Sequence, residues 1–224
     1  MSVSSVVIID DHPLFRKGIR QLLELEPSLE VVAEAANGEE GVRLVLHHAP
    51  NLVLLDLNMK GMGGLRALEA IKRRHPETRV VILTVSDNSD DLIGTIRAGA
   101  NGYLLKDMEP EEMLVCLKDA VSGKTVISTE LTGQLAKALH QEATANSRSV
   151  KELTEREIQI LRGVADGKSN KLIARDLDIT EGTVKVHVKN LLHKLNFHSR
   201  VEAAIWVVAN SSDSVSKTVG THLR

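Results

Sequence analysis

The stretch Asn51–Gly61, "NLVLLDLNMKG", places a single carboxylate inside a strongly apolar run. Five of the six residues before Asn58 are apolar, and the sixth is Asp56. A short apolar run that ends in a turn is typical of a strand buried on both faces of a parallel sheet. Because buried carboxylates are rarely left without a partner, the stretch predicts a strand that brings Asp56 to a site shared with other polar groups.

The first 125 residues repeat this alternation of apolar runs and turns. Four more apolar runs occur, "VVIID", "VVAEA", "VVILTV" and "GYLLK". Segments with helical spacing of apolar residues lie between and after the runs, at 14–25, 38–48, 65–75, 92–98 and 111–121. Strands that alternate with helices predict an α/β fold, a doubly wound five-stranded parallel sheet with helices on both faces.

The length fits one large domain or two modest ones, and the cysteine content suits a reducing compartment. The chain has 224 residues, and typical domains hold about 100–200 residues. Its single cysteine, Cys116, excludes an internal disulfide framework. The start of the sequence lacks a signal-peptide pattern, and no stretch approaches the ~18 apolar residues of a membrane span. We therefore expect a cytoplasmic protein without a membrane partner.

The rear of the chain has a different pattern and charge. Residues 151–209 carry ten Lys and Arg against eight Asp and Glu, although the whole chain has a formal net charge of −2. Their periodicity predicts four short helices, with capping-box patterns at Thr154 and Glu157 and at Ser199 and Glu202. The expected organisation is a domain at 1–125, a linker with a helix at 126–152, a small all-α domain at 153–209 and a disordered tail at 210–224.

Polar residues stand where the predicted strands end. Asp10 and Asp11 follow the first run, Thr84 lies near the end of the fourth and Lys106 ends the fifth. The carboxyl ends of parallel strands meet at one edge of the sheet, so these side chains should converge with Asp56. Three close carboxylates repel one another unless a cation joins them. Oxygen ligands with no His or Cys nearby favour Mg²⁺, and a carboxylate beside that ion can accept a phosphoryl group.

The motifs "IIDDHP", "LVLLDLNMKG", "VVILTVSD" and "GYLLKD", at these spacings, resemble the receiver domain of bacterial two-component response regulators over residues 5–123. The resemblance implies a flavodoxin-like fold in which a sensor histidine kinase phosphorylates Asp56. It also implies a set of Mg²⁺ ligands: Asp10, Asp11, Asp56 and the backbone carbonyl of Asn58. Three further residues would respond to the phosphoryl group: Thr84, Tyr103 and Lys106.

One position departs from the receiver pattern. The turn after the phosphorylated residue usually contains proline, where this chain has Lys60. Lysine lacks the fixed φ of proline, so the sequence predicts a looser turn with an added positive charge near the acidic site. The metal and phosphoryl ligands do not depend on this residue.

The segment 182–195 predicts an amphipathic helix. One stripe is apolar and forms the side expected to be buried: Val184, Val188, Leu191, Leu192 and Leu195. The opposite face carries a polar and basic set: Lys185, Val186, Lys189 and Asn190, flanked by His187 and His193. Lysines four residues apart repel each other unless a polyanion neutralises them. A short helix and a tight turn precede this segment, and together they predict a helix-turn-helix.

The motifs "LTEREIQIL", "KSNKLIARDLDITEGTVKVHVKNLLHKL" and "SRVEAA" resemble the LuxR-type DNA-binding domain over residues 151–209. The resemblance implies base contacts from Lys185, Val186 and Lys189. It implies contacts with the DNA backbone from a second group: Lys171, Thr183, His187 and Lys194. A third group, on the final helix, would form the homodimer contact of the phosphorylated protein: Val201, Ala204, Ile205 and Val208.

A receiver followed by this DNA-binding domain is similar to the NarL/FixJ family, and within it the motifs are most similar to the nitrate/nitrite response regulators. We therefore expect a transcription regulator activated by phosphorylation, with DNA, a sensor histidine kinase and RNA polymerase as partners. We further hypothesise that the unphosphorylated receiver covers the recognition helix. Chemical labelling of Lys185 that does not change on phosphorylation would contradict this hypothesis.

Two alternatives stay open at the level of sequence. A Mg²⁺-dependent phosphohydrolase with an aspartate nucleophile also places a carboxylate at a strand end, but such enzymes typically have a second acid two residues later, where this chain has Asn58. The other alternative is a constitutive DNA-binding protein with an inert receiver. Turnover of a small phosphate ester by residues 1–125 would support the first, and full function of an Asp56→Asn variant would support the second.

Overall fold

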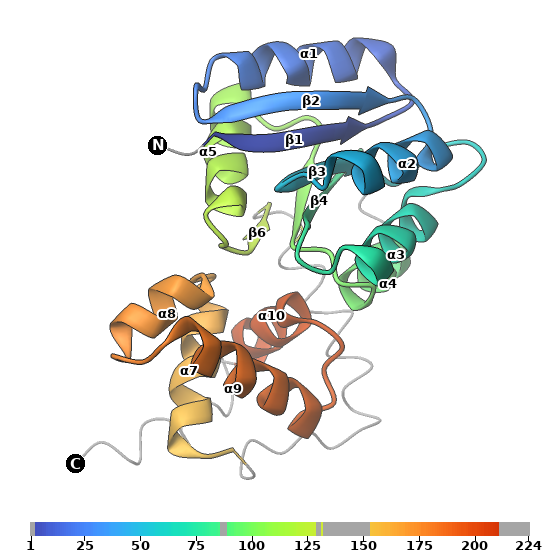
Figure 1. Ribbon diagram of the computed structural model, residues 1–224. Helices are drawn as coiled ribbons and strands as arrows, with labels where there is room; N and C mark the ends of the chain where they lie inside the picture. The colour runs from blue at the N-terminus through green and yellow to red at the C-terminus, as the bar shows by residue number, and fades with distance from the viewer. Residues whose placement is uncertain (1–2, 86–88, 129–130, 132–152, 211–224) are drawn as a thin grey trace. The chain divides into compact units, whose positions relative to one another are not determined.

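The computed structural model describes residues 3–85, 89–128, 131 and 153–210, which fall into two compact units divided after Ser128. Figure 1 shows the two units. Most of the linker expected at 126–152 and of the tail expected at 210–224 lies outside the described residues, which include a short strand at Val126–Ile127 and place Asn210 at the end of a helix. Within those residues, no helix combines the length and the apolar character needed to cross a membrane.

The first unit alternates strands and helices along the chain. Its elements are β1 (Ser4–Ile9), α1 (Pro13–Glu24), β2 (Leu29–Ala35), α2 (Gly38–His48), β3 (Leu52–Asp56), α3 (Gly64–Arg74), β4 (Arg79–Thr84), α4 (Ser89–Arg97), β5 (Gly102–Leu105), α5 (Pro110–Val121) and β6 (Val126–Ile127). All strand pairs are parallel, in the order β2-β1-β3-β4-β5-β6. The doubly wound α/β fold is therefore confirmed, and the sequence missed only the two-residue β6, which is too short to show a period.

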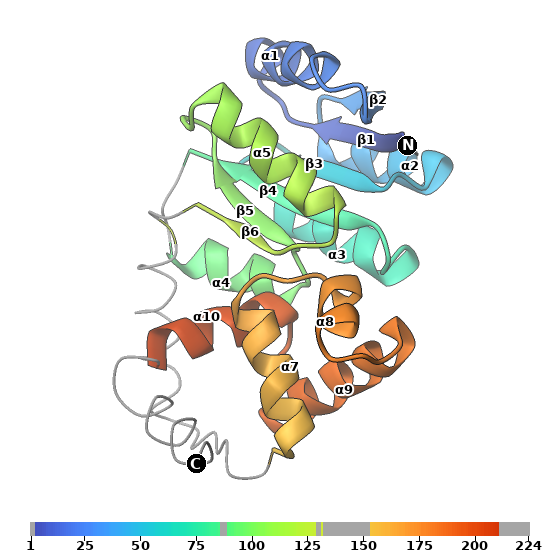
Figure 2. The ribbon, with the colours of Figure 1, turned by 90° about the vertical axis from the view of Figure 1, so that its left-hand side faces the viewer.

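Apolar side chains on both faces of the sheet form the core of the first unit. Helices α1 and α5 cover one face, where Ile8 packs with Leu23 and Leu117, and the remaining helices cover the other face (Figure 2). Successive side chains of a strand point to opposite faces, so a strand covered on both sides must be apolar throughout. This accounts for the run at β3, whose five residues are all buried.

The register of the sheet brings the ends of distant segments together. Ile9 of β1 pairs with Leu55 of β3, and Asp56 pairs with Leu83 of β4. On the other side of β4, Thr84 pairs with Leu105 of β5. The residues that end β1, β3, β4 and β5 therefore lie side by side at one edge, as the sequence predicted.

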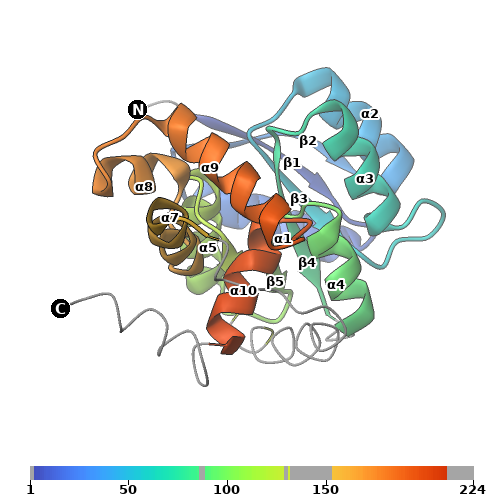
Figure 3. The ribbon, with the colours of Figure 1, turned by 90° about the horizontal axis from the view of Figure 1, so that it is seen from below.

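The second unit is a small helical domain. It contains α7 (Glu155–Ala165), α8 (Asn170–Asp176), α9 (Glu181–Lys194) and α10 (Arg200–Asn210) around a common apolar core (Figures 1 and 3). The core includes Ile160, Leu191 and Trp206. Helices α8 and α9, joined by a short turn, form the helix-turn-helix that the sequence predicted.

Side chains cap the start of each of these helices. Thr154 and Glu157 form the complete capping box at α7, and Ser169 and Thr180 cap α8 and α9 through their hydroxyl groups. At α10, the hydroxyl of Ser199 accepts a hydrogen bond from the backbone N–H of Glu202 at 3.1 Å, and the Glu202 carboxylate also accepts one from the backbone N–H of His198 at 2.7 Å.

Candidate functional site

Four charged side chains gather at the carboxyl edge of the sheet. Asp10 and Asp56 are each only 1% exposed. Lys106 follows β5, and its Nζ lies 2.7 Å from Asp10 Oδ2 and 3.1 Å from Asp56 Oδ1. Asp11 stands beside them and is partly exposed. The strand register thus produces the cluster of three carboxylates and one ammonium that the sequence predicted.

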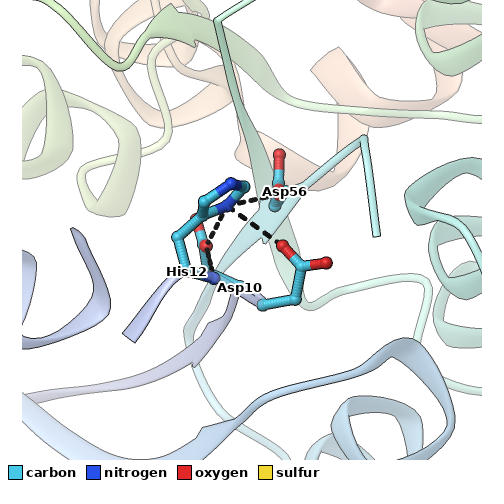
Figure 4. Close-up of side chains that lie close together, drawn as sticks. Asp10, His12 and Asp56 are labelled. Carbon is cyan, nitrogen blue, oxygen red and sulfur yellow. Dashed lines mark hydrogen bonds and ion pairs between the residues drawn. The ribbon is translucent and has the colours of Figure 1, made fainter. Parts of the chain in front are cut away.

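His12 also belongs to this cluster, which the sequence analysis did not expect. Its Nδ1 lies 3.3 Å from Asp10 Oδ1, 3.0 Å from Asp11 Oδ1 and 3.8 Å from Asp56 Oδ2 (Figure 4). Its backbone N–H donates to Asp10 Oδ1 at 2.7 Å. The expectation that no histidine lies near the acids was therefore wrong. The motif "DDHP" carried the signal, because Pro13 starts α1 and so holds His12 in the turn just after the strand.

Burial and charge act against each other at Asp56. Burial raises the pKa of the Asp56 carboxyl, Lys106 opposes this shift, and the neighbouring charge of Asp10 adds to it. The backbone N–H of Asn58 donates to Oδ1 at 3.3 Å, while Oδ2 accepts no hydrogen bond from any described residue. Asp56 therefore presents one oxygen that is held in place and one that remains available to a cation or an electrophile.

The other residues expected at this site lie on neighbouring strands. Thr84 is 1% exposed at the end of β4, and its backbone carbonyl accepts a hydrogen bond from the Lys106 N–H at 2.8 Å. Tyr103 is 2% exposed in β5. Two residues of α1 that the sequence analysis missed also contact the site. Arg16 donates to the Asp10 carbonyl at 2.6 Å, and Lys106 Nζ lies 4.8 Å from the centre of the Phe15 ring.

The loop after β3 is fastened to the start of α2. Glu39 Oε1 accepts a hydrogen bond from the Met62 N–H at 3.1 Å. A side chain at Gly38 would meet the Met62 carbonyl at 2.3 Å, so this close approach requires glycine. Gly61, with φ of 79°, turns the loop just before this contact. The anchor from Glu39 therefore fixes the same loop in which Lys60 stands at the proline position.

Helix α9 exposes the basic face that its sequence predicted. Every residue of the predicted apolar stripe is buried or partly buried in the core of the unit: Val184, Val188, Leu191, Leu192 and Leu195. On the opposite face Val186 is 58% exposed, and Lys185 and Lys189 are exposed beside it. Lys185 Nζ lies 3.8 Å from Glu181, whereas Lys189 forms no ion pair with any described residue. Helix α9 therefore presents an exposed valine between two exposed lysines on this face.

The expected DNA-backbone and dimer residues fall into different environments. Lys171 and Thr183 are exposed and His187 is half-buried, but Lys194 Nζ is bound to Glu157 Oε2 at 2.8 Å. On α10, Ala204 belongs to the core of its own unit, and Val208 is 47% exposed. Val201 and Ile205 are buried. Lys194 must therefore leave Glu157 to reach a phosphate, and Val208 is the member of the dimer group with the most exposed side chain.

The Glu157 carboxylate gives the helical unit a pH-dependent contribution to stability. Burial acts to raise the pKa of Glu157, but hydrogen bonds from Lys194 and Thr154 outweigh it and hold the pKa below the usual value. A carboxyl with a lowered folded-state pKa stabilises the fold above its unfolded pKa, and this contribution disappears as pH falls through the folded value. We expect Glu157→Gln to lower the free energy of unfolding by about 1–2 kcal/mol at pH 7.

Urea denaturation at several pH values measures this effect. The difference between Glu157→Gln and wild type should shrink at acid pH, where the wild-type carboxyl is also protonated. Glu155→Gln, in the same helical turn but without these bonds, is the matched control. A difference that stays constant over the whole pH range would assign the loss to packing rather than to charge.

Comparison with known proteins matches both units to bacterial regulators. The family model described as "Response regulator receiver domain" matches residues 6–118, and the one described as "Bacterial regulatory proteins, luxR family" matches residues 151–207. The nitrate/nitrite response regulator NarL of Escherichia coli K12 is 48% identical over 204 residues, which cover 91% of this chain and 94% of NarL. The chain belongs to the LuxR-type response regulators.

A further relative agrees with this assignment, and a solved structure shares the fold. The nitrate/nitrite response regulator NarP of Escherichia coli K12 is 49% identical over 200 residues, covering 89% of this chain and 92% of NarP. A solved structure of two RcsB dimers bound to two parallel DNAs shares the fold, with a TM-score of 0.57, 24% identity and coverage of 93% and 99%. This response regulator is a phosphorylation-dependent transcription regulator, not an enzyme.

Proposed function

We propose that the chain accepts a phosphoryl group on Asp56 from a sensor histidine kinase and then binds promoter DNA through α9. The observation that carries this proposal is the environment of Asp56. Its carboxylate is 1% exposed, lies 3.1 Å from Lys106 Nζ, and keeps one oxygen without a hydrogen bond from the described residues. A buried carboxylate with a free oxygen and an adjacent cation suits nucleophilic attack on phosphorus.

The donor set at this edge fits a magnesium ion. Among the described residues, the three carboxylates form ion pairs with Lys106 and His12 alone, so with a neutral histidine this cluster carries two excess negative charges. Carboxylate and carbonyl oxygens are the ligands that Mg²⁺ prefers. Asp10, Asp11, Asp56 and the Asn58 carbonyl would hold the ion, which supplies positive charge to the phosphoryl oxygens. His12 would have to turn away from the acids, and its 63% exposed side chain leaves room for this movement.

The transfer exchanges one bond to phosphorus for another. An Asp56 oxygen forms the new O–P bond as the N–P bond to the kinase histidine breaks, and the imidazole leaves with the electron pair. Lys106 remains beside the new phosphoryl group and offsets part of its charge. Thr84 and Tyr103 lie on the adjacent strands β4 and β5, and their response to this charge would carry the signal away from Asp56.

The helical unit would turn that signal into promoter recognition. Lys185, Val186 and Lys189 would contact bases, with Lys171 and Thr183 on the DNA backbone. We propose a homodimer on paired half-sites, in the manner of the RcsB dimers seen on DNA. The relatives NarL and NarP support control of nitrate/nitrite-responsive genes, with RNA polymerase as a further partner at the promoter.

Incubation with acetyl phosphate and Mg²⁺ tests the proposal directly. Intact mass spectrometry should show one added phosphoryl group, and peptide mapping should place it on Asp56. Binding to promoter DNA should strengthen in the same sample. Modification at another residue, or modification without any change in DNA binding, would contradict the proposal.

The Glu39 anchor predicts a measurable effect on magnesium binding. Glu39→Ala should weaken Mg²⁺ binding about tenfold, because residues that orient metal ligands typically contribute at least this much. The anchored loop carries the Asn58 carbonyl, and Lys60 does not restrict it as proline would. Isothermal titration with Mg²⁺ measures the dissociation constant.

Two companion variants separate positioning from general damage. Glu39→Gln keeps an oxygen that accepts the Met62 N–H and should bind Mg²⁺ nearly as well as wild type. In a Lys60→Pro background, Glu39→Ala should weaken Mg²⁺ binding less, because the proline restricts the loop independently. Equal losses in the alanine and glutamine variants, or a loss unaffected by Lys60→Pro, would rule out the anchoring role.

A further inference from the structure

A cavity lies at the opposite end of the strands from Asp56. It has a volume of about 510 Å³ and is lined by residues at the amino ends of β1, β3 and β4, together with the end of α3. Backbone hydrogen bonds from Asn51 to Ser5 and from Arg79 to Asn51 hold its strands in register. The phosphorylation site uses the carboxyl ends of these same strands, so the cavity is a separate feature of the first unit.

Arg79 places in the wall of this cavity a positive charge that no carboxylate of the described residues pairs. Its Nη2 donates to the backbone carbonyl of Lys124 at 2.6 Å, while its Nε is buried without a hydrogen-bond partner among the described residues. No carboxylate of those residues forms an ion pair with it. Burial lowers the pKa of Arg79 to about 10, so the side chain still carries its charge at neutral pH. A half-buried guanidinium without a counter-charge is an unfavourable arrangement that a bound anion would relieve.

The surroundings of Arg79 are also positively charged. Arg74 and His75, at the end of α3, line the same cavity. Next to it, burial and then the charge of Arg79 lower the pKa of Lys72 to about 8. Glu77 is the one acidic residue in the lining, and it is exposed. The two arginines outnumber this acid by one, so the lining carries a net positive charge and favours an anion.

We propose that this cavity binds a small molecule carrying a phosphate group, with the Arg79 guanidinium as the main contact. The planar fork of arginine matches the oxygens of phosphate, which can accept two parallel hydrogen bonds. A phosphate monoester would place its negative charge against both Arg74 and Arg79. The volume of the cavity exceeds that of a bare phosphate ion and leaves space for an attached organic group. The site is independent of Asp56, since it lies at the other end of the sheet.

Nuclear magnetic resonance of the full chain, in EDTA and without Mg²⁺, tests the site. The Nε–Hε signal of Arg79 is followed during separate titrations with inorganic phosphate and with glycerol phosphate, and with chloride at matched ionic strength. Both phosphates should shift this signal along a saturating curve, with tighter binding for the monoester if the cavity holds its organic group. Chloride should give no saturation. Equal responses to chloride and phosphate would mean screening of charge and would overturn the site.

Three variants make the result specific to the cavity. Arg79→Gln should weaken phosphate binding about tenfold or more, the loss expected for a charge-assisted hydrogen bond. Glu77→Gln leaves Arg79 intact and should tighten binding, because it removes the one opposing charge. Arg73 lies on α3 beside Arg74 but outside the lining of the cavity. Arg73→Gln should therefore bind phosphate as wild type does. Failure of Glu77→Gln to tighten binding, or an equal loss in Arg73→Gln, would refute the proposal even if Arg79→Gln proved unstable.

Discussion

Asp56→Asn is expected to abolish phosphorylation and, with it, the response of DNA binding to acetyl phosphate. The amide of asparagine has nearly the same shape as the carboxylate, but it is neutral and a poor nucleophile for phosphorus. Intact mass after incubation with acetyl phosphate and Mg²⁺ should therefore show only background modification. Affinity for promoter DNA should be the same before and after the incubation. Asp119→Asn, which changes a partly exposed acid paired with Lys124, should behave as wild type in both assays.

The same variant should be more stable than wild type when Mg²⁺ is removed. Burial raises the pKa of Asp56 above its value in the unfolded chain, so the folded state holds the proton more tightly. Stability from this group therefore falls as pH rises through that window, and at pH 7 the ionised carboxylate is a cost. We expect Asp56→Asn to raise the free energy of unfolding in EDTA at pH 7. A less stable variant would mean that the contact with Lys106 outweighs desolvation.

Lys189→Ala is expected to weaken binding to promoter DNA by about 1–3 kcal/mol, or roughly fivefold to 150-fold. Lys189 is exposed and has no ion pair with any described residue, so its ammonium is available to a base edge. Binding to random DNA should fall much less, because base contacts carry the sequence preference. Competition assays with promoter and random duplexes measure the two affinities.

Lys171→Ala is the matched comparison for Lys189→Ala. Lys171 is exposed on α8 and is expected to contact a phosphate, so its loss should weaken binding to all sequences about equally. It should also reduce the slope of log K against log salt by about one. Equal losses on promoter and random DNA for Lys189→Ala would remove it from the base-reading group.

The sequence predicted the sheet and the acidic edge because both follow from the periodicity of the apolar residues and from the parallel topology of the strands. Five apolar runs with acids or polar residues at their ends admit few arrangements once the strands are parallel. The convergence of Asp10, Asp56 and Lys106 followed from that topology alone. The capping box of Thr154 and Glu157 was also predictable from the sequence, because its two hydrogen bonds depend only on a spacing of three residues.

Contacts that depend on side-chain direction were not predictable in the same way. His12 was excluded from the site although it is adjacent to Asp11. The motif "DDHP" holds it in the turn after β1, but the approach of its ring to Asp56 depends on the pairing of β1 with β3. The ion pair between Lys194 and Glu157 joins positions 37 residues apart, and no local sequence pattern predicts it. The Glu39 anchor and the half-buried position of Arg79 likewise depend on where loops meet, which periodicity does not specify.

Both edge strands of the sheet, β2 and β6, have features that oppose pairing with the sheet of another copy. On one side β6 offers two residues, Val126 and Ile127, which is too little backbone to extend a neighbouring molecule's sheet. On the other side β2 carries Glu30 and Glu34, and charges on an outer strand oppose aggregation. Copies of this regulator that gather at high local concentration on a promoter would therefore assemble through their helices. Their sheets would not pair edge to edge.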